Sequence, residues 1–427
     1  MSPEAEHRLS TLPGGVRVVT ERVSSVRSVA IGCLIHAGSS FEPAPQAGIS
    51  HLLEHMLFRG TERYGSQEVD QIFDAMGSEL DAQTDRETTA LSTRVLDRHL
   101  ERAFDVMGQM LWHPKLEDLQ AEREVVIEEI AMYEDDPQER IFDVLGEAIF
   151  GEHPLGRPVI GNAQSVGALQ EGDLRDYHDT HYLPANVVIA AAGSIEHEQM
   201  VELVSNVVPA PELKAEQLRT SVPPPHPSRR VRFIAKDTEQ YHFCIGGPGI
   251  ARSDERRFAL RVMDVILGAG PSSRMFQEVR ERRGLAYAVF SFSGLYEQTG
   301  EIGIYVGTRP DNLAQTVATI AAELARFVEH PADAAELDRA RENVKGRMAL
   351  AMESTGVRMA RLGASILHDL PLLSLEESMA KVDAVGIENL RELAGELLHL
   401  PDLSIAAIGP DEGELERALR SLEAVVA

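Results

Sequence analysis

The feature that most constrains the fold is an internal repeat. Three landmarks of the first half return in the same order in the second half: a strand-like run ending at Cys33 and again at Cys244, a helix-like run closing at His113 and again at His330, and an apolar run ending at Gly193 and again at Gly409. The offsets are 211, 217 and 216 residues. Two copies at a nearly constant offset indicate a duplicated domain, because a solenoid would show more copies.

The repeat also predicts how the chain divides. A chain of 427 residues is long for a single core, so two domains are expected. Between the copies lies a proline-rich, polar stretch that fits an extended linker. We expect an N-terminal domain at 1–210, a linker at 211–229 and a homologous C-terminal domain at 230–427. In each half, runs such as VRVVTERV alternate with long helical patterns, which predicts an α+β fold of two α/β-sandwich halves.

Charge and composition limit the function classes. The net charge of −27 argues against a nucleic-acid partner, because no basic patch is present to displace counterions. Such a charge either serves solubility or forms an acidic interior that attracts basic peptides, and composition does not separate the two. No apolar run approaches the roughly 20 residues of a membrane span, and the N-terminus has no secretory pattern. Cys33 and Cys244 are expected as buried free thiols in a reducing compartment, so we expect a cytoplasmic protein.

The stretch GISHLLEHMLFRG, from Gly48 to Gly60, carries the chemistry. Its apolar residues have helical spacing, and His51, Glu54 and His55 form a second stripe on the same helix. Two imidazoles one turn apart can hold one zinc ion, and Glu54 is placed to take a proton from a water that zinc activates. This HxxEH pattern is the inverzincin motif. The alternative is a surface helix that carries two histidines, and a catalytic zinc still needs a third protein ligand.

A second helical pattern offers that ligand. The segment AEREVVIEEIAMYEDDP predicts a helix with Glu122, Val126, Glu129 and Tyr133 along one partly apolar face, whereas Glu124 and Glu128 point away. A ligand needs an inward face, which slightly favours Glu129. The alternative is that all these carboxylates are solvated helix surface.

Two further stretches bear on the site. LDAQTDRETTALSTRV, from Leu80 to Val95, has the threonine-rich alternation of a strand with one polar face, and it could lie at a sheet edge. Shifted by 211 residues, His51 and His55 fall on Val262 and Ile266. The second half therefore keeps the apolar helix without the histidines, and one zinc per chain is expected.

HLLEH followed by ERxxVxxE about 70 residues later resembles the pitrilysin and mitochondrial-processing-peptidase family of zinc peptidases. The resemblance covers nearly the whole chain. Two further stretches, YEDDPQERIFDVLGEAIFGEHPLGRPVIGN and LGAGPSSRMFQEVRERRGLAYAVFSF, look like the short bacterial members. It implies that His51, His55 and Glu129 bind zinc and that Glu54 is the catalytic base. It also implies that Glu122 orients a zinc ligand.

In QEVRERRGLAY the resemblance places a substrate-binding pair on Arg280 and Tyr287, which could stabilise an oxyanion. Without it, Arg280 would be one more exposed charge and Tyr287 an ordinary strand aromatic. Many relatives carry asparagine at the position of Asp81. The contacts between substrate and that strand are therefore less predictable than the class of enzyme.

The resemblance implies a zinc endopeptidase whose two halves face each other as a clam shell around a closed chamber. Peptide substrate would add a strand to the edge formed by Leu80, Asp81, Ala82, Gln83 and Thr84. The short bacterial relatives imply a homodimer. The alternatives are a non-catalytic peptide-binding or processing-complex subunit, and a hydrolase that acts on a non-peptide bond with the same zinc site.

Overall fold

The structure is a computed structural model that describes residues 7–209, 225–226 and 228–426. Its contacts divide the chain into two units, each with its own sheet. The first unit comprises Met1–Ala131, Pro158–Val222 and Ala349–Ser374, and the second comprises Met132–Arg157, Pro223–Met348 and Leu375–Ala427. Most of the expected linker at 211–229 lies outside the described residues, and the boundaries at 210 and 230 stay a prediction.

The first unit is built on a six-stranded sheet with the order β1-β2-β6-β3-β5-β4. Only the β2–β6 pair is parallel; the other neighbours are antiparallel. The strands are β1 His7–Thr11, β2 Arg17–Arg22, β3 Ser28–Ile35, β4 Leu80–Thr84, β5 Thr89–Leu96 and β6 Val187–Gly193. The helices with all or most of their length here are α1 Ile49–Leu57, α2 Ser66–Met76, α3 Leu100–Trp112, α4 Leu119–Asp135, α6 Ala163–Ala168, α7 Glu171–His181, α8 His197–Val207 and α12 Thr355–Leu367.

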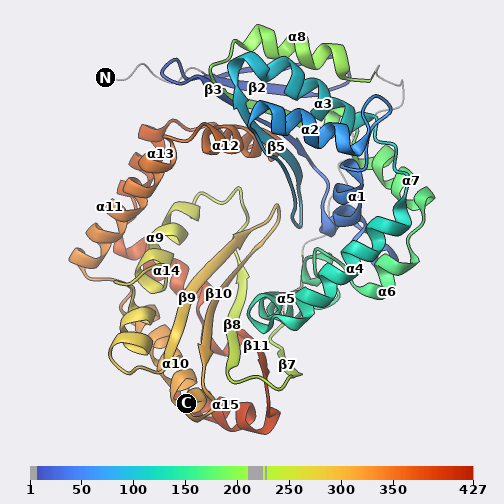
Figure 1. The fold of residues 1–427 in the computed structure, drawn as a ribbon. Coiled ribbons are helices and arrows are strands. Elements are labelled where there is room, and N and C mark those ends of the chain that lie inside the picture. The colour runs from blue at the N-terminus through green and yellow to red at the C-terminus, as the bar shows by residue number, and fades with distance from the viewer. Residues whose placement is uncertain (1–6, 210–224, 227, 427) are drawn as a thin grey trace. The chain divides into compact units, whose positions relative to one another are not determined.

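Both faces of this sheet are covered at its centre, which explains why β3 and β6 read as unbroken apolar runs. On one face, Ile31 and Cys33 of β3 belong to the core that contains residues of α1, α3 and α8. On the other face, the alternate residues Ala30 and Leu34 pack with Met359 of α12. Figure 1 shows α3 and α8 on one side of the sheet and α12 on the other.

Helix α12 comes from the second half of the sequence, yet it packs on the first unit's sheet, mainly on β6 and β3. An ion cluster anchors it there. Glu21 of β2 has a fully buried side chain and accepts hydrogen bonds from Arg358 and, at 3.0 Å, from Arg361. A side chain at Gly32 would overlap the sulfur of Met359, so glycine permits this close approach.

The stretch from Leu80 to Val95 is a hairpin, so the prediction of one strand is wrong. β4 and β5 pair antiparallel, with Thr84 opposite Thr89. The chain turns at Asp85, whose carboxylate accepts the backbone N–H groups of Glu87 and Thr88 at 2.7 Å. Such a local side-chain bond stabilises a turn in place of a continued strand. β4 lies at the edge of the sheet, as the strand's polar face suggested.

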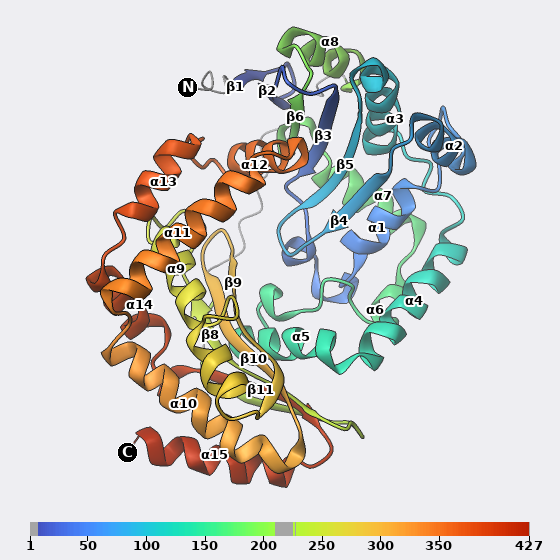
Figure 2. The same ribbon diagram turned by 60° about the vertical axis from the view of Figure 1, so that its left-hand side comes forward.

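The second unit repeats this plan with a five-stranded sheet in the order β7-β11-β8-β10-β9. Its strands are β7 Val231–Ala235, β8 Tyr241–Gly249, β9 Ala286–Leu295, β10 Gly300–Thr308 and β11 Ser404–Gly409. Its helices are α5 Pro137–Phe150, α9 Arg257–Leu267, α10 Leu313–Glu329, α11 Ala334–Ala351 (whose last residues fall in the first unit), α13 Leu375–Asp383, α14 Ile387–Leu397 and α15 Glu412–Val426. Helix α5, from the first half of the sequence, packs on β8 and β11 (Figure 2).

The predicted duplication is confirmed by equivalent elements. Cys33 and Cys244, both buried and unpaired, lie on β3 and β8, which stand next to β6 and β11 in their sheets. Helices α3 and α10 end just before the two His-Pro pairs. Val262 and Ile266 are buried on α9, as expected for an apolar counterpart of α1. No helix among the described residues has the length and apolar character to cross a membrane.

Candidate metal and catalytic site

Helix α1 is held by its apolar face and by its first turn. Leu52, Leu53 and Met56 are fully buried in the first unit's core. Upstream of the helix, the carboxylate of Glu42 accepts the backbone N–H groups of Gly48 and Ser50, each at 2.9 Å. This satisfies donors that a helix start leaves unpaired, and a negative charge there is favoured by the helix dipole. The packing and the cap fix the direction in which the two histidines point.

Three side chains converge as predicted from the sequence. The Nε2 atom of His51 lies 3.6 Å from Oε1 of Glu129, and Nε2 of His55 lies 3.4 Å from Oε2 of Glu129. Ligand atoms of a tetrahedral zinc at the usual bond lengths of roughly 2.0–2.1 Å lie about 3.3 Å apart. These residues therefore fit a zinc ion, and they form the one such cluster found among the described residues.

The buried face of α4 favours Glu129 over Glu128 as the predicted third ligand. Glu122 and Val126 are buried on that face and Glu129 is partly buried, whereas Glu124 and Glu128 are exposed. The helix faces predicted from the sequence are therefore confirmed, and the role of Glu129 as a metal ligand stays a prediction.

Glu122 contacts the ring of His55 on the side away from Glu129, which suits the predicted binding of zinc. Oε1 of Glu122 lies 2.9 Å from Nδ1 of His55, so Nδ1 carries the proton and Nε2 is free to bind a metal. The other carboxylate oxygen of Glu122 accepts a hydrogen bond from Arg59. Sequence reasoning missed Arg59, although it follows His55 by four residues and therefore lies on the same helical face.

His51 is suited to bind metal as a neutral imidazole. Burial, and secondarily the neighbouring His55, lowers the pKa of His51 to about 4. A metal ligand must be deprotonated, so His51 is ready at neutral pH.

Glu54 lies beside the cluster but outside it. Its Oε2 accepts a hydrogen bond of 2.5 Å from the hydroxyl of Thr84, and that hydroxyl lies 3.3 Å from the hydroxyl of Thr89. Burial raises the pKa of Glu54, and the bond from Thr84 opposes the shift. A carboxylate with a raised pKa near a metal is suited to accept and return a proton.

The strand predicted to bind substrate ends beside Glu54. Leu80 and Ala82 of β4 pack toward the core, whereas Asp81 and Gln83 are exposed on the other face. Thr84, the last residue of β4, points its hydroxyl at Glu54. Since β4 is an edge strand, one side of its backbone has no strand neighbour in the described sheet.

Arg280 and Tyr287 lie together in the second unit, and the site above is formed by the first unit alone. Arg280 belongs to the π-helix Phe276–Glu281, and Tyr287 to the edge strand β9. The Arg280 guanidinium stacks over the Tyr287 ring at 4.3 Å and donates to its backbone oxygen at 3.0 Å. Tyr287 is 78% exposed, so its hydroxyl is available to a ligand. Their contact with substrate stays a prediction.

Removal of any one ligand should release the metal. We expect His51→Ala, His55→Ala and Glu129→Gln each to lower the zinc content of the purified protein, because a three-ligand site loses much of its affinity with one ligand gone. Glu128→Gln is the matched control, one residue away on the exposed side of α4. Metal analysis after dialysis measures the effect. If Glu128→Gln lost its zinc and Glu129→Gln kept it, the third ligand would be Glu128 and not Glu129.

Tyr287→Phe should lower the rate of peptide hydrolysis by about 10²–10³, the range for loss of one oxyanion donor, and leave the zinc content unchanged. Arg280→Ala should do the same and also weaken peptide binding, because it removes the cation stacked on Tyr287. Arg282→Ala, an exposed arginine that pairs with Glu278, is the control. Unchanged kinetics in both variants would mean that Arg280 and Tyr287 are ordinary surface residues without a role in hydrolysis.

Comparison with known proteins shows which family the chain resembles. Residues 17–163 match the family described as Insulinase (Peptidase family M16), and residues 168–344 match the Peptidase M16 inactive domain. An uncharacterized zinc protease of Streptomyces coelicolor is 38% identical over 94% of this chain and 89% of its own. One from Bacillus subtilis is 37% identical over 94% of this chain and 97% of its own.

Two further proteins are similar to this chain at lower sequence identity. A probable mitochondrial-processing peptidase subunit beta of Arabidopsis thaliana is 31% identical over 95% of this chain and 78% of its own. A crystal structure of a protease from Helicobacter pylori has the same fold, with a TM-score of 0.88 over 95% of this chain and all of that one, at 20% identity. With the matched families and the predicted duplication in agreement, the chain belongs to peptidase family M16, the insulinase family.

Proposed function

We propose that the chain is a zinc-dependent endopeptidase that cleaves unfolded peptides. The observation that carries this proposal is the geometry around α1. His51, His55 and Glu129 fit one zinc ion, and Glu54 lies beside them and accepts a hydrogen bond from Thr84. The same threonine ends an edge strand on which an extended peptide can pair. Metal ligands, a base and a peptide-binding edge therefore meet in one unit.

The side chains divide the work of hydrolysis. A zinc ion held by His51, His55 and Glu129 would supply a Lewis acid that polarises the peptide carbonyl and lowers the pKa of water. Glu54 takes a proton from the attacking water and then gives it to the leaving amine, so that one peptide bond and one water become a carboxylic acid and an amine, and the acid then loses its proton to solvent. The free edge of β4 orients the peptide backbone beside Glu54.

We also propose how substrate reaches the site and how the chains assemble. The family resemblance supports a closed chamber between the two halves, a homodimer and a cytoplasmic location. If a chamber encloses Glu54, a folded protein cannot reach the base but an unfolded peptide of a few tens of residues can.

The test compares one peptide in two states. The free peptide and the same sequence embedded in a stable folded domain are incubated with the full chain, and products are identified by mass, with a metal chelator as the control. We expect cleavage of the free peptide only, and none after chelation. Equal cleavage of both would contradict the chamber, and cleavage of neither would contradict the endopeptidase.

A peptide-binding subunit of a processing complex is the second candidate, favoured because the Arabidopsis relative is named as a subunit. It predicts that the purified chain binds zinc and peptide without cleaving. The intact ligand set and Glu54 favour the enzyme, since a binding subunit has no need of a base beside the metal cluster.

A further inference from the structure

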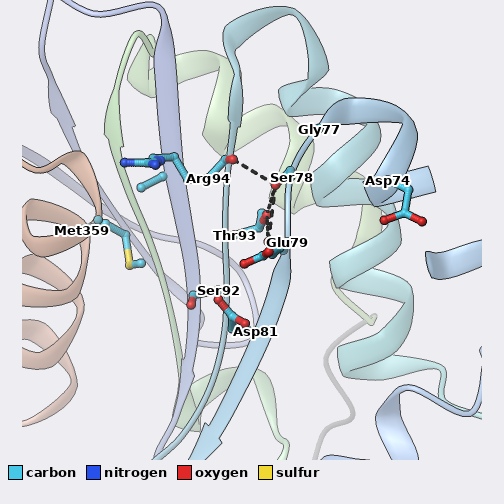
Figure 3. Close-up of a pocket in the computed structure, with 11 residues that line it drawn as sticks. Asp74, Gly77, Ser78, Glu79, Asp81, Ser92, Thr93, Arg94 and Met359 are labelled. Carbon is cyan, nitrogen blue, oxygen red and sulfur yellow. Dashed lines mark hydrogen bonds between the residues drawn. The ribbon is translucent and has the colours of Figure 1, made fainter. Parts of the chain in front are cut away.

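The first unit has polar clusters outside the three candidate ligands, and these clusters differ in burial. One lines a cavity of about 560 Å³ at the start of β4, where Ser78 donates a hydrogen bond to the backbone oxygen of Arg94 (Figure 3). The charged groups that line this cavity are exposed, so water solvates them. The other cluster joins Arg59, Glu122 and His55, and its central residue, Glu122, is only 8% exposed. A buried carboxylate depends on the protein groups that contact it.

The two oxygens of the Glu122 carboxylate are divided between α1 and the chain that follows it. Oε1 lies 2.9 Å from Nδ1 of His55, whereas Oε2 accepts a hydrogen bond from Nε of Arg59 and also lies beside its Nη2. Arg59 follows the end of α1, but its backbone N–H still donates to the oxygen of Met56 at 3.1 Å, so the chain stays wound there. Arg59 therefore lies one turn beyond His55 on the same side, and both side chains reach one carboxylate.

The contact with Arg59 fixes the direction of the carboxylate. An ionised carboxylate that is removed from water needs charged or hydrogen-bonding partners, and a guanidinium supplies both. Because Arg59 holds Oε2, the carboxylate cannot turn without breaking a charge-assisted hydrogen bond, and Oε1 stays on Nδ1 of His55. In a neutral ring with its proton on Nδ1, the free nitrogen is Nε2, which lies 3.4 Å from Oε2 of Glu129.

His51 has no equivalent support. Its Nδ1 atom is buried and has no hydrogen-bond partner among the residues that the structure describes. Packing orients that ring, and no hydrogen bond to Nδ1 from the described part of the chain holds a proton there. Of the two imidazoles, His55 is thus the one whose proton the protein places.

We propose that Arg59 is a positioning residue for zinc binding. Acting through Glu122, it holds His55 in the form that has its proton on Nδ1 and leaves Nε2 open to the metal. Groups that hydrogen-bond to a metal ligand from behind change metal affinity about 10–100-fold. The inference rests on the zinc site of the proposed function, but it requires neither a peptide nor its cleavage.

The sign of the effect separates this role from a simple effect of charge. A bare positive charge near the site repels a zinc ion, so its removal would tighten zinc binding. Removal of an arginine that orients Glu122 has the opposite effect, because the carboxylate loses one of its two anchors and His55 loses its fixed proton. Weaker zinc binding without Arg59 therefore supports positioning, and tighter or unchanged binding overturns it.

Zinc dissociation constants of full-length variants give the first test, by competition with a chelator of known affinity. We expect Arg59→Met to weaken zinc binding about tenfold, the lower end of the range for such groups. Arg59→Lys keeps a charged donor to the carboxylate and should bind zinc more tightly than Arg59→Met. Arg63→Met is the matched control, because Arg63 pairs at 2.7 Å with Asp105 of α3 and should not affect zinc. An equal loss in Arg63→Met would overturn the proposal, since the loss of any ion pair after α1 would then suffice.

A double substitution tests the route through Glu122. Glu122→Gln alone should weaken zinc binding about 10–100-fold. Adding Arg59→Met should weaken it no further, because Arg59 acts through Glu122 and the two effects are not independent. Losses that multiply would mean that Arg59 acts on the metal by another route, which would overturn the proposal.

The tautomer of His55 is the property that a merely structural arginine would leave unchanged. Nitrogen NMR of the zinc-free protein, at a pH where the ring is neutral, reports which ring nitrogen carries the proton. We expect the proton on Nδ1 in the wild type and in Arg63→Met, and shared between the two nitrogens in Arg59→Met. If Arg59→Met unfolded at a lower temperature but kept the wild-type tautomer, Arg59 would be a structural contact only.

The outcomes distinguish this inference from the proposed function. If the wild-type chain binds zinc but cleaves no peptide, the endopeptidase fails, and weaker zinc binding with an altered tautomer in Arg59→Met still supports positioning. If the wild-type chain cleaves peptides while the Arg59 variants keep its zinc affinity and tautomer, positioning fails and the endopeptidase stands. Arg59→Gln, with a shorter polar side chain, repeats the test in case methionine disturbs folding, and the same weakening of zinc binding is expected.

Discussion

Glu54→Gln should reduce peptide hydrolysis by about 10²–10⁴, the usual contribution of a positioned general base. The amide keeps the size of the side chain and can still bond to Thr84, but it cannot take a proton. Zinc content should stay at the wild-type level, because Glu54 is not one of the three clustered ligands. Rates with an unstructured peptide and metal analysis on the same preparation measure both outcomes.

Two controls sharpen this test. Glu128→Gln removes a carboxylate from the exposed side of α4 and should leave rate and zinc unchanged. Thr84→Val removes the hydroxyl that positions Glu54 and should give an intermediate rate, which Thr84→Ser should restore. If Glu54→Gln lost its zinc, Glu54 would be a ligand, and if it kept a near-normal rate, another group would be the base.

The isolated first half of the sequence, residues 1–209, should fail to form the stable first unit. It lacks α12, whose Met359, Leu362 and Leu367 are buried against the sheet. Losing the burial of these three side chains removes about 4.5–9 kcal/mol, taking roughly 1.5–3 kcal/mol for each side chain. Typical domains have only about 5–15 kcal/mol of stability, so the fragment should unfold or aggregate. Circular dichroism and thermal unfolding of the fragment measure this.

The missing helix can be supplied to test the cause. A fusion of residues 1–209 to residues 349–374 through a flexible connection should recover a cooperative transition and bind zinc without cleaving peptides, since Arg280 and Tyr287 are absent. A cooperatively folded fragment without α12 would contradict the argument.

The ion cluster under α12 allows a finer test in the full chain. Replacing Arg358 and Arg361 with methionine strands the buried Glu21 and should destabilise the protein by about 3–5 kcal/mol. Adding Glu21→Met should recover most of that loss, because a buried ion cluster replaced by apolar residues is often nearly neutral. No recovery in the triple variant would mean that the arginines act by packing rather than by charge.

Sequence reasoning succeeded where the information is local. The spacing of His51, Glu54 and His55 on one helix sets the site, and the buried face of α4 was enough to favour Glu129 over Glu128. The duplication was visible because the strands containing Cys33 and Cys244 are central to their sheets and cannot change without loss of the core.

What sequence reasoning missed depends on contacts between distant segments. The hydrogen bond from Thr84 to Glu54 forms only when β4 takes its place at the edge of the sheet. The hairpin was missed because the alternating pattern continues through the turn at Asp85, so the two strands looked like one. The exchange of α5 and α12 left no local signal. Each helix is amphipathic in the ordinary way, and nothing in its periodicity tells which sheet it covers.

Because of that exchange, each half of the duplicated sequence supplies a helix that completes the sheet of the other half. A chain cut once between Pro209 and Pro225 would yield two fragments, neither of which contains a complete sheet with both of its helix layers. The fragments should therefore stay associated after the cut, as an obligate heterodimer does, and regain zinc binding when produced separately and mixed. Each fragment would supply the helix that completes the sheet of the other, α5 from the first fragment and α12 from the second.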